Sequence, residues 1–244
     1  YRRQRQMCIR DSKKISQPVT RGNIASIYED SSKELWICTW EEGLYRIKTD
    51  STIENFRHDP KNPNSICADF VRSCCEDNAG NLWIGTFHGL NRYEKSTGKF
   101  QLYTANANKP DGLTHSSIWC IVKDEQGTIW LGTYFGGVNY YIFGSDQFQI
   151  YPYGASFNHL SGKAVRQIIN APDNGLYIAT EDGGLNYLNN KKEITRAERL
   201  HKQMQIYAKN IHSLWLDKDN SLWLGLFLKG ALHYIPHLNR TVDY

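Results

Sequence analysis

The chain has 244 residues, 40% of them hydrophobic and 13% aromatic, with 19 glycines and a formal net charge of +4. Residues 1–12 hold four arginines and one aspartate, so they supply +3 of that charge and leave +1 for the rest, which argues against a nucleic-acid partner. No apolar run approaches the roughly 20 residues of a membrane-spanning helix, and the composition favours an all-β protein rich in turns.

We expect residues 1–21 to be a non-native or disordered segment outside the fold. The stretch Met7-Cys8-Ile9-Arg10-Asp11-Ser12 resembles the translation of a transposase-type sequencing adapter. It also lacks the apolar core of a signal peptide. The folded part is therefore expected to begin at residue 22.

A tandem repeat with a step of 46 or 47 residues fills residues 22–244. Its anchor is an aromatic residue in a short apolar run that reads Leu-Trp-Ile-Gly-Thr in its clearest copy. The anchors are Trp36, Trp83, Trp130, Tyr177 and Trp223. Cys38 replaces the glycine in the first copy, and Leu226 replaces the threonine in the fifth.

Each repeat predicts four short strands, which we call A to D. In the second copy, an apolar run closes on the acidic turn Glu76-Asp77, the anchor run follows, and alternating runs begin at Gly89 and Phe100. Asp77 and Gly80 supply the turn chemistry that a hairpin needs. The repeats cover approximately residues 22–66, 67–113, 114–160, 161–207 and 208–244.

Five such units predict an all-β protein with five four-stranded antiparallel blades of a β-propeller. A single four-stranded sheet cannot bury both of its faces, so neighbouring units stack radially. The anchor tryptophan is then a wedge between blades, and the small residue after it lets the next sheet approach closely. We expect an incomplete ring, an arc with exposed end blades that favours aggregation.

The run from Glu76 to Tyr93, and the linker from His58 to Ile66, resemble the two-component regulator propeller repeat. The resemblance covers residues 22–244 and is weakest in the fourth copy. It implies a fragment of a seven-bladed periplasmic sensor, in which the repeats detect oligosaccharides for a hybrid histidine kinase. It further implies partners: the remaining blades and sensor domains of a parent chain, and a second copy in a homodimer.

Ligand contacts are expected on the loops between strands B and C, because loops carry variable side chains on a rigid scaffold. These loops interleave aromatic and charged residues, which suits stacking on sugar rings and hydrogen bonding to hydroxyls. The candidates are Trp40, Glu41, Glu42, Phe87, His88, Tyr134, Phe135, Glu181, Asp182, Phe227 and Lys229. Packing of the same aromatics against a neighbouring domain is the alternative.

No pattern in the chain predicts a catalytic site, a metal site or a cofactor. Outside residues 1–12 there are five cysteines without a Cys-x-x-Cys pair, which suggests small buried residues and leaves one disulfide open. Two other functions stay open: a propeller lyase of the streptogramin-lyase type, for which His88 is the available loop histidine, and a non-enzymatic protein-interaction propeller.

Overall fold

The computed structural model describes residues 19–106, 112–144, 147–196 and 208–244, which form five antiparallel sheets of four strands each. Blade 1 contains β1 (Ile24–Glu29), β2 (Leu35–Thr39), β3 (Leu44–Ile47) and β4 (Ile53–Phe56). Blade 2 contains β5 (Val71–Glu76), β6 (Leu82–Thr86), β7 (Leu90–Glu94) and β8 (Lys99–Tyr103). Blade 3 contains β9 (Ile118–Lys123), β10 (Ile129–Thr133), β11 (Val138–Ile142) and β12 (Gln147–Tyr151). Blade 4 contains β13 (Val165–Asn170), β14 (Leu176–Thr180), β15 (Gly184–Leu188) and β16 (Ile194–Arg196). Blade 5 contains β17 (Ile211–Leu216), β18 (Leu222–Leu226), β19 (Gly230–Ile235) and β20 (Arg240–Asp243).

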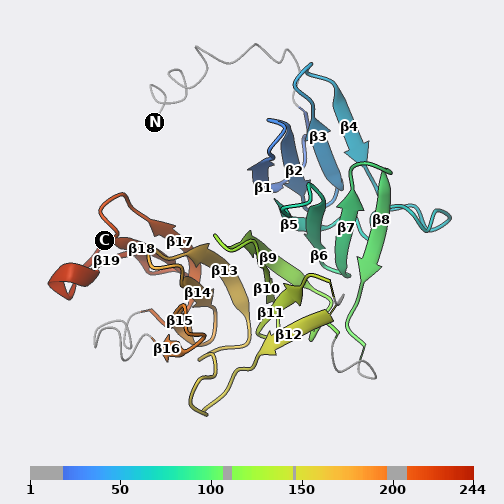
Figure 1. Cartoon of the computed structure of the whole chain (residues 1–244). Coiled ribbons are helices and arrows are strands. Elements are labelled where there is room, and N and C mark those ends of the chain that lie inside the picture. The colour runs from blue at the N-terminus through green and yellow to red at the C-terminus, as the bar shows by residue number, and fades with distance from the viewer. Residues whose placement is uncertain (1–18, 107–111, 145–146, 197–207) are drawn as a thin grey trace, which may run out of the picture.

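The predicted all-β propeller fold is confirmed, and the blades follow one another in an open arc (Figure 1). Strands pair in chain order within each blade. Strand A of each blade contacts strand A of the next, from β1 through β5, β9 and β13 to β17. The A strands therefore line the inner side of the arc, and this positions the site described below.

Helical structure is minimal in the described part of the chain. It consists of one 3-10 turn, η1 (Pro236–Leu238), between β19 and β20. Over these same residues, no helix has the length and apolar character needed to cross a membrane. Of the predicted N-terminal extension, residues 1–18 lie outside the described residues.

The anchor tryptophans of the first three blades are buried between neighbouring sheets. The ring of Trp36 packs 5.9 Å from Tyr93 of blade 2, and that of Trp83 packs 4.6 Å from Tyr141 of blade 3. Trp130 joins a core cluster that includes Ile168 of blade 4. These contacts fill the space between sheets, as large aromatic side chains do in protein cores.

Trp223, the anchor of blade 5, differs from this pattern. It is half-buried, and its ring stacks 4.1 Å from His233 of the same blade. Because its neighbours lie within its own sheet, it is not a wedge between two described blades.

One aspartate in each of the first three blades holds both the A–B turn and the anchor tryptophan. In blade 2, Asp77 Oδ1 accepts the backbone N–H groups of Ala79 and Asn81, while Asp77 Oδ2 accepts the indole N–H of Trp83 at 2.9 Å. Asp30 and Asp124 accept the indole N–H groups of their own blades at 2.8 Å. The sequence predicts the turn at Asp77 but not the bond from its carboxylate to the indole.

The small residue after the anchor makes room for the next blade. A Cβ atom on Gly85 would lie 2.8 Å from Ile118 on strand A of blade 3, and one on Gly132 would lie 2.6 Å from Val165 on strand A of blade 4. In blade 1 the slot holds Cys38, which is fully buried against Cys74 of blade 2. All described cysteines are free thiols.

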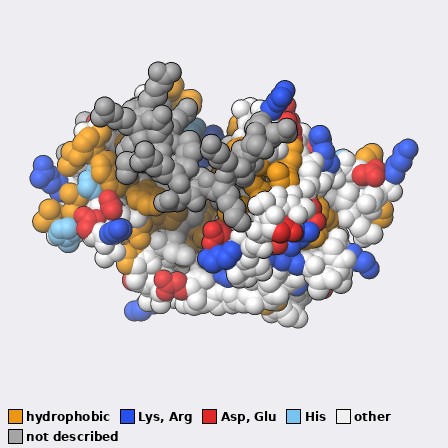
Figure 2. All heavy atoms as spheres, turned by 90° about the horizontal axis from the view of Figure 1, so that it is seen from above, with side chains coloured by type: hydrophobic (Ala, Val, Ile, Leu, Met, Phe, Trp, Pro, Cys, Tyr) orange, Lys and Arg blue, Asp and Glu red, His pale blue; other side chains and the backbone are white. Residues whose placement is uncertain are grey.

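The two ends of the arc expose apolar side chains. In blade 1, Ile24 is 50% exposed and Ile27 60%, whereas Val71 and Cys74, their counterparts in blade 2, are buried against blade 1. At the other end, Trp215 is 68% exposed. Figure 2 shows hydrophobic side chains gathered at its left end, over blade 5.

Candidate functional site

Every A strand contains a β-bulge at its second residue. In blade 2, Val71 pairs with Thr86 and Ser73 pairs with Gly85, so Arg72 is left between them without a partner in β6. The same shift recurs in the other blades, and the bulged residues are Ala25, Arg72, Trp119, Arg166 and His212. Bulges redirect side chains and are frequent beside active sites. Here they form a row on the inner side of the arc.

The first residue of each B–C loop is fastened beside the bulge of its own blade. Its backbone N–H donates to the carbonyl of the residue that precedes strand A, as in the 3.0 Å bond from Trp40 to Asn23. Equivalent bonds of 2.9–3.2 Å fix Phe87, Tyr134, Glu181 and Phe227. Predicted loop residues and bulged strand residues therefore share one face.

Arg72 lies between aromatic rings from blades 1 and 3. Its guanidinium carbon is 4.2 Å from the ring centroid of Trp40 in blade 1 and 4.1 Å from that of Trp119 in blade 3. The ring of Tyr134 stacks on Trp119 at 4.8 Å with an interplanar angle of 9°. Cation–π contacts of this kind hold a guanidinium in place without using its N–H donors in conventional hydrogen bonds.

Blades 4 and 5 supply the charged half of the site. Arg166 forms an ion pair with Glu181 and also lies 3.8 Å from the ring centroid of Trp119. His212 Nε2 is 3.5 Å from Glu181 Oε1, and its ring stacks 4.9 Å from Phe227. Burial and the charge of Arg166 lower the pKa of His212 despite the opposing effect of Glu181, so the imidazole is neutral at pH 7.

We call this set of side chains the bulge cluster. Its members are Trp40, Arg72, Trp119, Tyr134, Arg166, Glu181, His212 and Phe227. It combines flat aromatic faces with two guanidinium groups, one carboxylate and one neutral imidazole. Such a surface can stack on an apolar ring face and hydrogen-bond polar groups around it.

Two predicted site residues, Glu42 and Asp182, brace the loops. Glu42 accepts hydrogen bonds from Thr20 and Tyr45, and Asp182 accepts the backbone N–H groups of Lys163 and Ala164. Both carboxylates are thereby tied to neighbouring loop segments. Their geometry is that of structural contacts.

The remaining predicted residues lie beside the cluster or are exposed. Phe87 packs against Phe70 and His88, with ring centroids 5.9 Å and 5.6 Å away, and Phe135 packs against Tyr134 at 4.0 Å. Glu41 and Lys229 are exposed. These residues border the face.

Sequence reasoning missed the four bulged residues that join the cluster, which are Arg72, Trp119, Arg166 and His212. A signal was present in the spacing of the buried residues. Val71 and Cys74 enter the same core cluster although they are three residues apart, and Ile118 with Ile121 repeats this in blade 3. A regular strand would place residues three apart on opposite faces, so this spacing marks the inserted residue.

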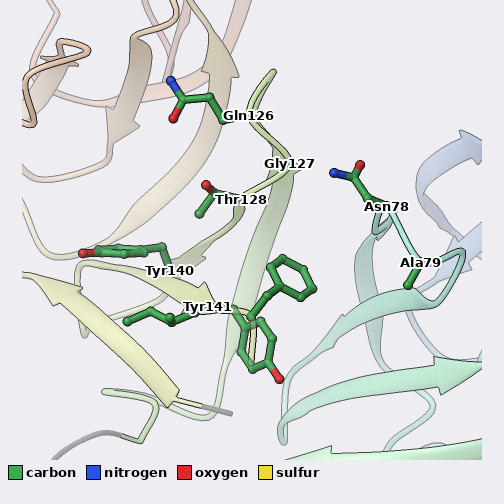
Figure 3. Close-up of a pocket in the computed structure, with 9 residues that line it drawn as sticks. Asn78, Ala79, Gln126, Gly127, Thr128, Tyr140 and Tyr141 are labelled. Atoms are coloured by element: carbon green, nitrogen blue, oxygen red, sulfur yellow. The ribbon is translucent and has the colours of Figure 1, made fainter. Parts of the chain in front are cut away.

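A separate hollow of about 600 Å³ lies between blades 2 and 3 (Figure 3). It is lined by the A–B turns of both blades, with Asn78 and Gln126, and by Tyr140 and Tyr141 of β11. Consecutive hairpin turns lie at opposite ends of a sheet, so this hollow opens away from the B–C loops. Within the described ranges, no three His, Cys, Asp or Glu side chains are grouped so that they could share a metal ion.

Solved structures share this fold. The extracellular domain of the putative hybrid two component system BT3049 from B. thetaiotaomicron superposes with a TM-score of 0.72 and 20% identity over 95% of this chain. The corresponding domain of BT4673 from the same organism gives 0.60 and 19% over 90%. The chain covers 30% and 37% of those two domains, about a third of their length.

A lyase also has the same fold. Virginiamycin B lyase from Staphylococcus aureus superposes with a TM-score of 0.65 and 16% identity, over 92% of this chain and 70% of the lyase. At these identities the likeness concerns the fold. The search of curated proteins found no significant relative.

The family model described as two component regulator propeller matches two segments of the sequence. They are residues 65–88 and 112–135, each of which runs from a D–A loop through strands A and B of one blade to its B–C loop. Together they contain Arg72, Trp119 and Tyr134 of the bulge cluster. The chain therefore carries two-component regulator propeller repeats.

Proposed function

We propose that this chain is the ligand-sensing propeller of an extracytoplasmic sensor in a hybrid two-component system. It binds an oligosaccharide at the bulge cluster and signals, through the rest of a homodimeric parent protein in the bacterial inner membrane, to a histidine kinase. The match to two-component regulator propeller repeats supports the sensor assignment. The likeness in fold to extracellular domains of hybrid systems supports a periplasmic location.

The observation that carries the proposal is the repeated bulge. All five sheets have one residue inserted at the second position of strand A, although the side chain at that position differs between blades. The pairing of the strands does not require this insertion. It places Arg72, Trp119, Arg166 and His212 beside the first residues of the B–C loops. A row of redirected aromatic and charged side chains on a rigid sheet is the arrangement that a ligand site needs.

The test is calorimetric titration of the chain with a panel of oligosaccharides. Trp119→Ala removes the ring that contacts Arg72, Arg166 and Tyr134, and we expect it to weaken binding at least about tenfold. Phe143→Ala, in the hollow between blades 2 and 3, is the matched aromatic control and should leave affinity unchanged. Unchanged affinity in Trp119→Ala, or a panel in which no oligosaccharide binds, would contradict the proposal.

A lyase is the second candidate, favoured by one observation. His212 lies beside the carboxylate of Glu181 on the inner side of the arc, and a histidine next to a carboxylate is a common acid–base pair. Incubation with virginiamycin B, followed by chromatography of the antibiotic, tests it. Conversion that His212→Ala abolishes would support a lyase, and an unchanged antibiotic would rule this substrate out.

A further inference from the structure

We infer that Arg72 is an anion-recognition residue, and that the ligand of the bulge cluster carries a carboxylate or sulfate group. This inference rests on the proposed function, because it names the class of oligosaccharide that the site would take.

Arg72 stands apart from the other half-buried arginines of the described chain. Arg46 and Arg92 lie within ion-pair distance of carboxylates, as does Arg166. Arg196 donates to backbone carbonyls of the loop that contains Gly154 and Ser156. Among the described residues, the Arg72 guanidinium has no ion pair within 4 Å and no hydrogen bond, and it packs on aromatic rings. Its Nε is buried without a hydrogen-bond partner, as are those of Arg92 and Arg166.

A second donor in the same place is also unmet. The indole Nε1 of Trp119 is buried without a hydrogen-bond partner in the described structure. Both groups can donate and neither can accept. Buried polar groups are almost always paired in proteins, so the two unmet donors call for a ligand that offers acceptors.

The local charge balance points the same way. Arg72 and Arg166 contribute two positive charges, Glu181 contributes one negative charge through its ion pair with Arg166, and His212 is neutral at pH 7. One positive charge is left over at Arg72. Burial and the repulsion from Arg166 lower the pKa of Arg72, but a guanidinium stays protonated at any physiological pH.

An anionic sugar satisfies all of these groups together. A carboxylate or sulfate accepts the planar fork of an arginine through two parallel hydrogen bonds, while the partly exposed ring of Trp40 offers a face for the sugar. An acidic group at Arg72 would also relieve the repulsion between the two guanidinium groups. Uronic-acid and sulfated oligosaccharides are the two carbohydrate classes with these groups.

The experiment compares uronic-acid, sulfated and neutral oligosaccharides of matched length, titrated into the full chain by calorimetry at two salt concentrations. We expect an acidic class to bind at least about tenfold more tightly than the neutral one, because hydrogen bonds to charged groups are worth that much. Arg72→Gln should remove the preference and the salt dependence. Arg72→Lys should restore only part of the affinity, since lysine lacks the planar fork.

Arg57→Gln is the matched control, because Arg57 is an exposed arginine that pairs with Asp69 outside the cluster. Thermal melting of each variant separates lost binding from lost folding.

Equal binding of neutral and acidic oligosaccharides, or unchanged binding of acidic oligosaccharides by Arg72→Gln, overturns the role of Arg72 and leaves the sensor proposal standing. If no oligosaccharide binds but sulfate or citrate binds through Arg72, the oligosaccharide proposal fails and the anion site stands. If nothing binds, both fail.

Discussion

At the scale of single residues, the repeat signature assigns each of its side chains a separate contact. The tryptophan fills the space between sheets, and the following glycine admits the next A strand. The threonine closes the B–C loop: Thr86 Oγ1 donates to the carbonyl of Gly89 at 2.8 Å and accepts the backbone N–H of His88. The aspartate six residues before the tryptophan accepts its indole N–H and so joins the A–B turn to the tryptophan. The signature therefore specifies the scaffold, and the side chains of the bulge cluster are those that vary between blades.

Replacing Asp77 by alanine should destabilise the chain by about 3 kcal/mol. The variant leaves the buried indole N–H of Trp83 and two turn N–H groups without their acceptor, and unmet buried donors cost about 1–3 kcal/mol each. Chemical denaturation measures the change. Asp217→Ala is the control, because Asp217 is exposed and, among the described residues, its carboxylate accepts one hydrogen bond, from the N–H of Lys218. Similar losses in both variants would contradict the role assigned to the indole bond.

Lys95 joins blades 1 and 2 by bonding two buried carboxylates. Its Nζ lies 2.6 Å from Asp30 and 2.5 Å from Glu76. Burial alone would raise the pKa of both carboxyl groups, but the hydrogen bonds outweigh it, those from Lys95 most of all, so each pKa lies below its usual value. Carboxyl groups whose pKa is lowered on folding stabilise the folded state at any pH above their usual titration range. This stabilisation is lost as the pH falls through the folded-state pKa.

Lys95→Met should accordingly cost about 3 kcal/mol at pH 7, since removing one partner leaves buried charges unpaired. The difference in unfolding free energy between this variant and the unsubstituted chain should shrink below about pH 4, where the carboxyl groups protonate. Denaturant midpoints measured from neutral to acid pH give this comparison. Lys33→Met, which removes an exposed pair with Glu29, should produce no measurable change. A pH-independent difference for Lys95→Met would show that the ion pairs are not its cause.

At the scale of elements, the distance between blades is set by the small residue on strand B. Gly132→Ala should destabilise the chain by about 1–3 kcal/mol, because its Cβ would lie 2.6 Å from Val165 and closer still to Cys120. In Gly225→Ala the new atom would meet the side chain of Ser213, which is exposed and free to turn aside. Thermal denaturation should rank the two variants in that order. The reverse order would mean that close approach of the next blade is not what the glycine provides.

The strands could be predicted from the sequence because each depends on local information. Alternation, turn residues and the step of the repeat fix four strands in each blade. The B–C loop candidates Trp40, Tyr134, Glu181 and Phe227 could also be found, since their position follows from the end of strand B. The bulged residues could not be found from alternation alone, because a bulge breaks the period of two on which that reading depends.

Which charges meet across the inner side of the arc could not be read from the sequence either. Glu181 follows strand B of blade 4, whereas His212 lies on strand A of blade 5 and Arg166 on strand A of blade 4. Their meeting depends on the angle between neighbouring blades. That angle results from the packing of buried side chains such as Val165 and Ile211, whose apolar character is visible in the sequence but whose geometry is not.

At the scale of the whole molecule, the two end faces of the arc are complementary in character. Ile24 and Ile27 occupy positions that are buried against the preceding blade in each of the other blades, and both are at least half exposed. Trp215, at the opposite end, is 68% exposed, while Cys75 at the same position of blade 2 is buried. An apolar face at each end of one molecule permits head-to-tail association between copies, which is not self-limiting.

The chain should therefore associate as its concentration rises, and replacing Ile24 and Ile27 together by serine should suppress this. Sedimentation velocity over a range of concentrations measures the effect, and melting curves should show little loss of stability, because both side chains are half exposed or more. Ile150→Ser is the matched control: Ile150 is 41% exposed on β12, the outer strand of blade 3, away from either end face. Trp215→Ser should act like the double variant, because it removes the other half of the same contact. If the unsubstituted chain sediments as a monomer at every concentration, or if Ile150→Ser suppresses association equally well, the end faces do not cause association.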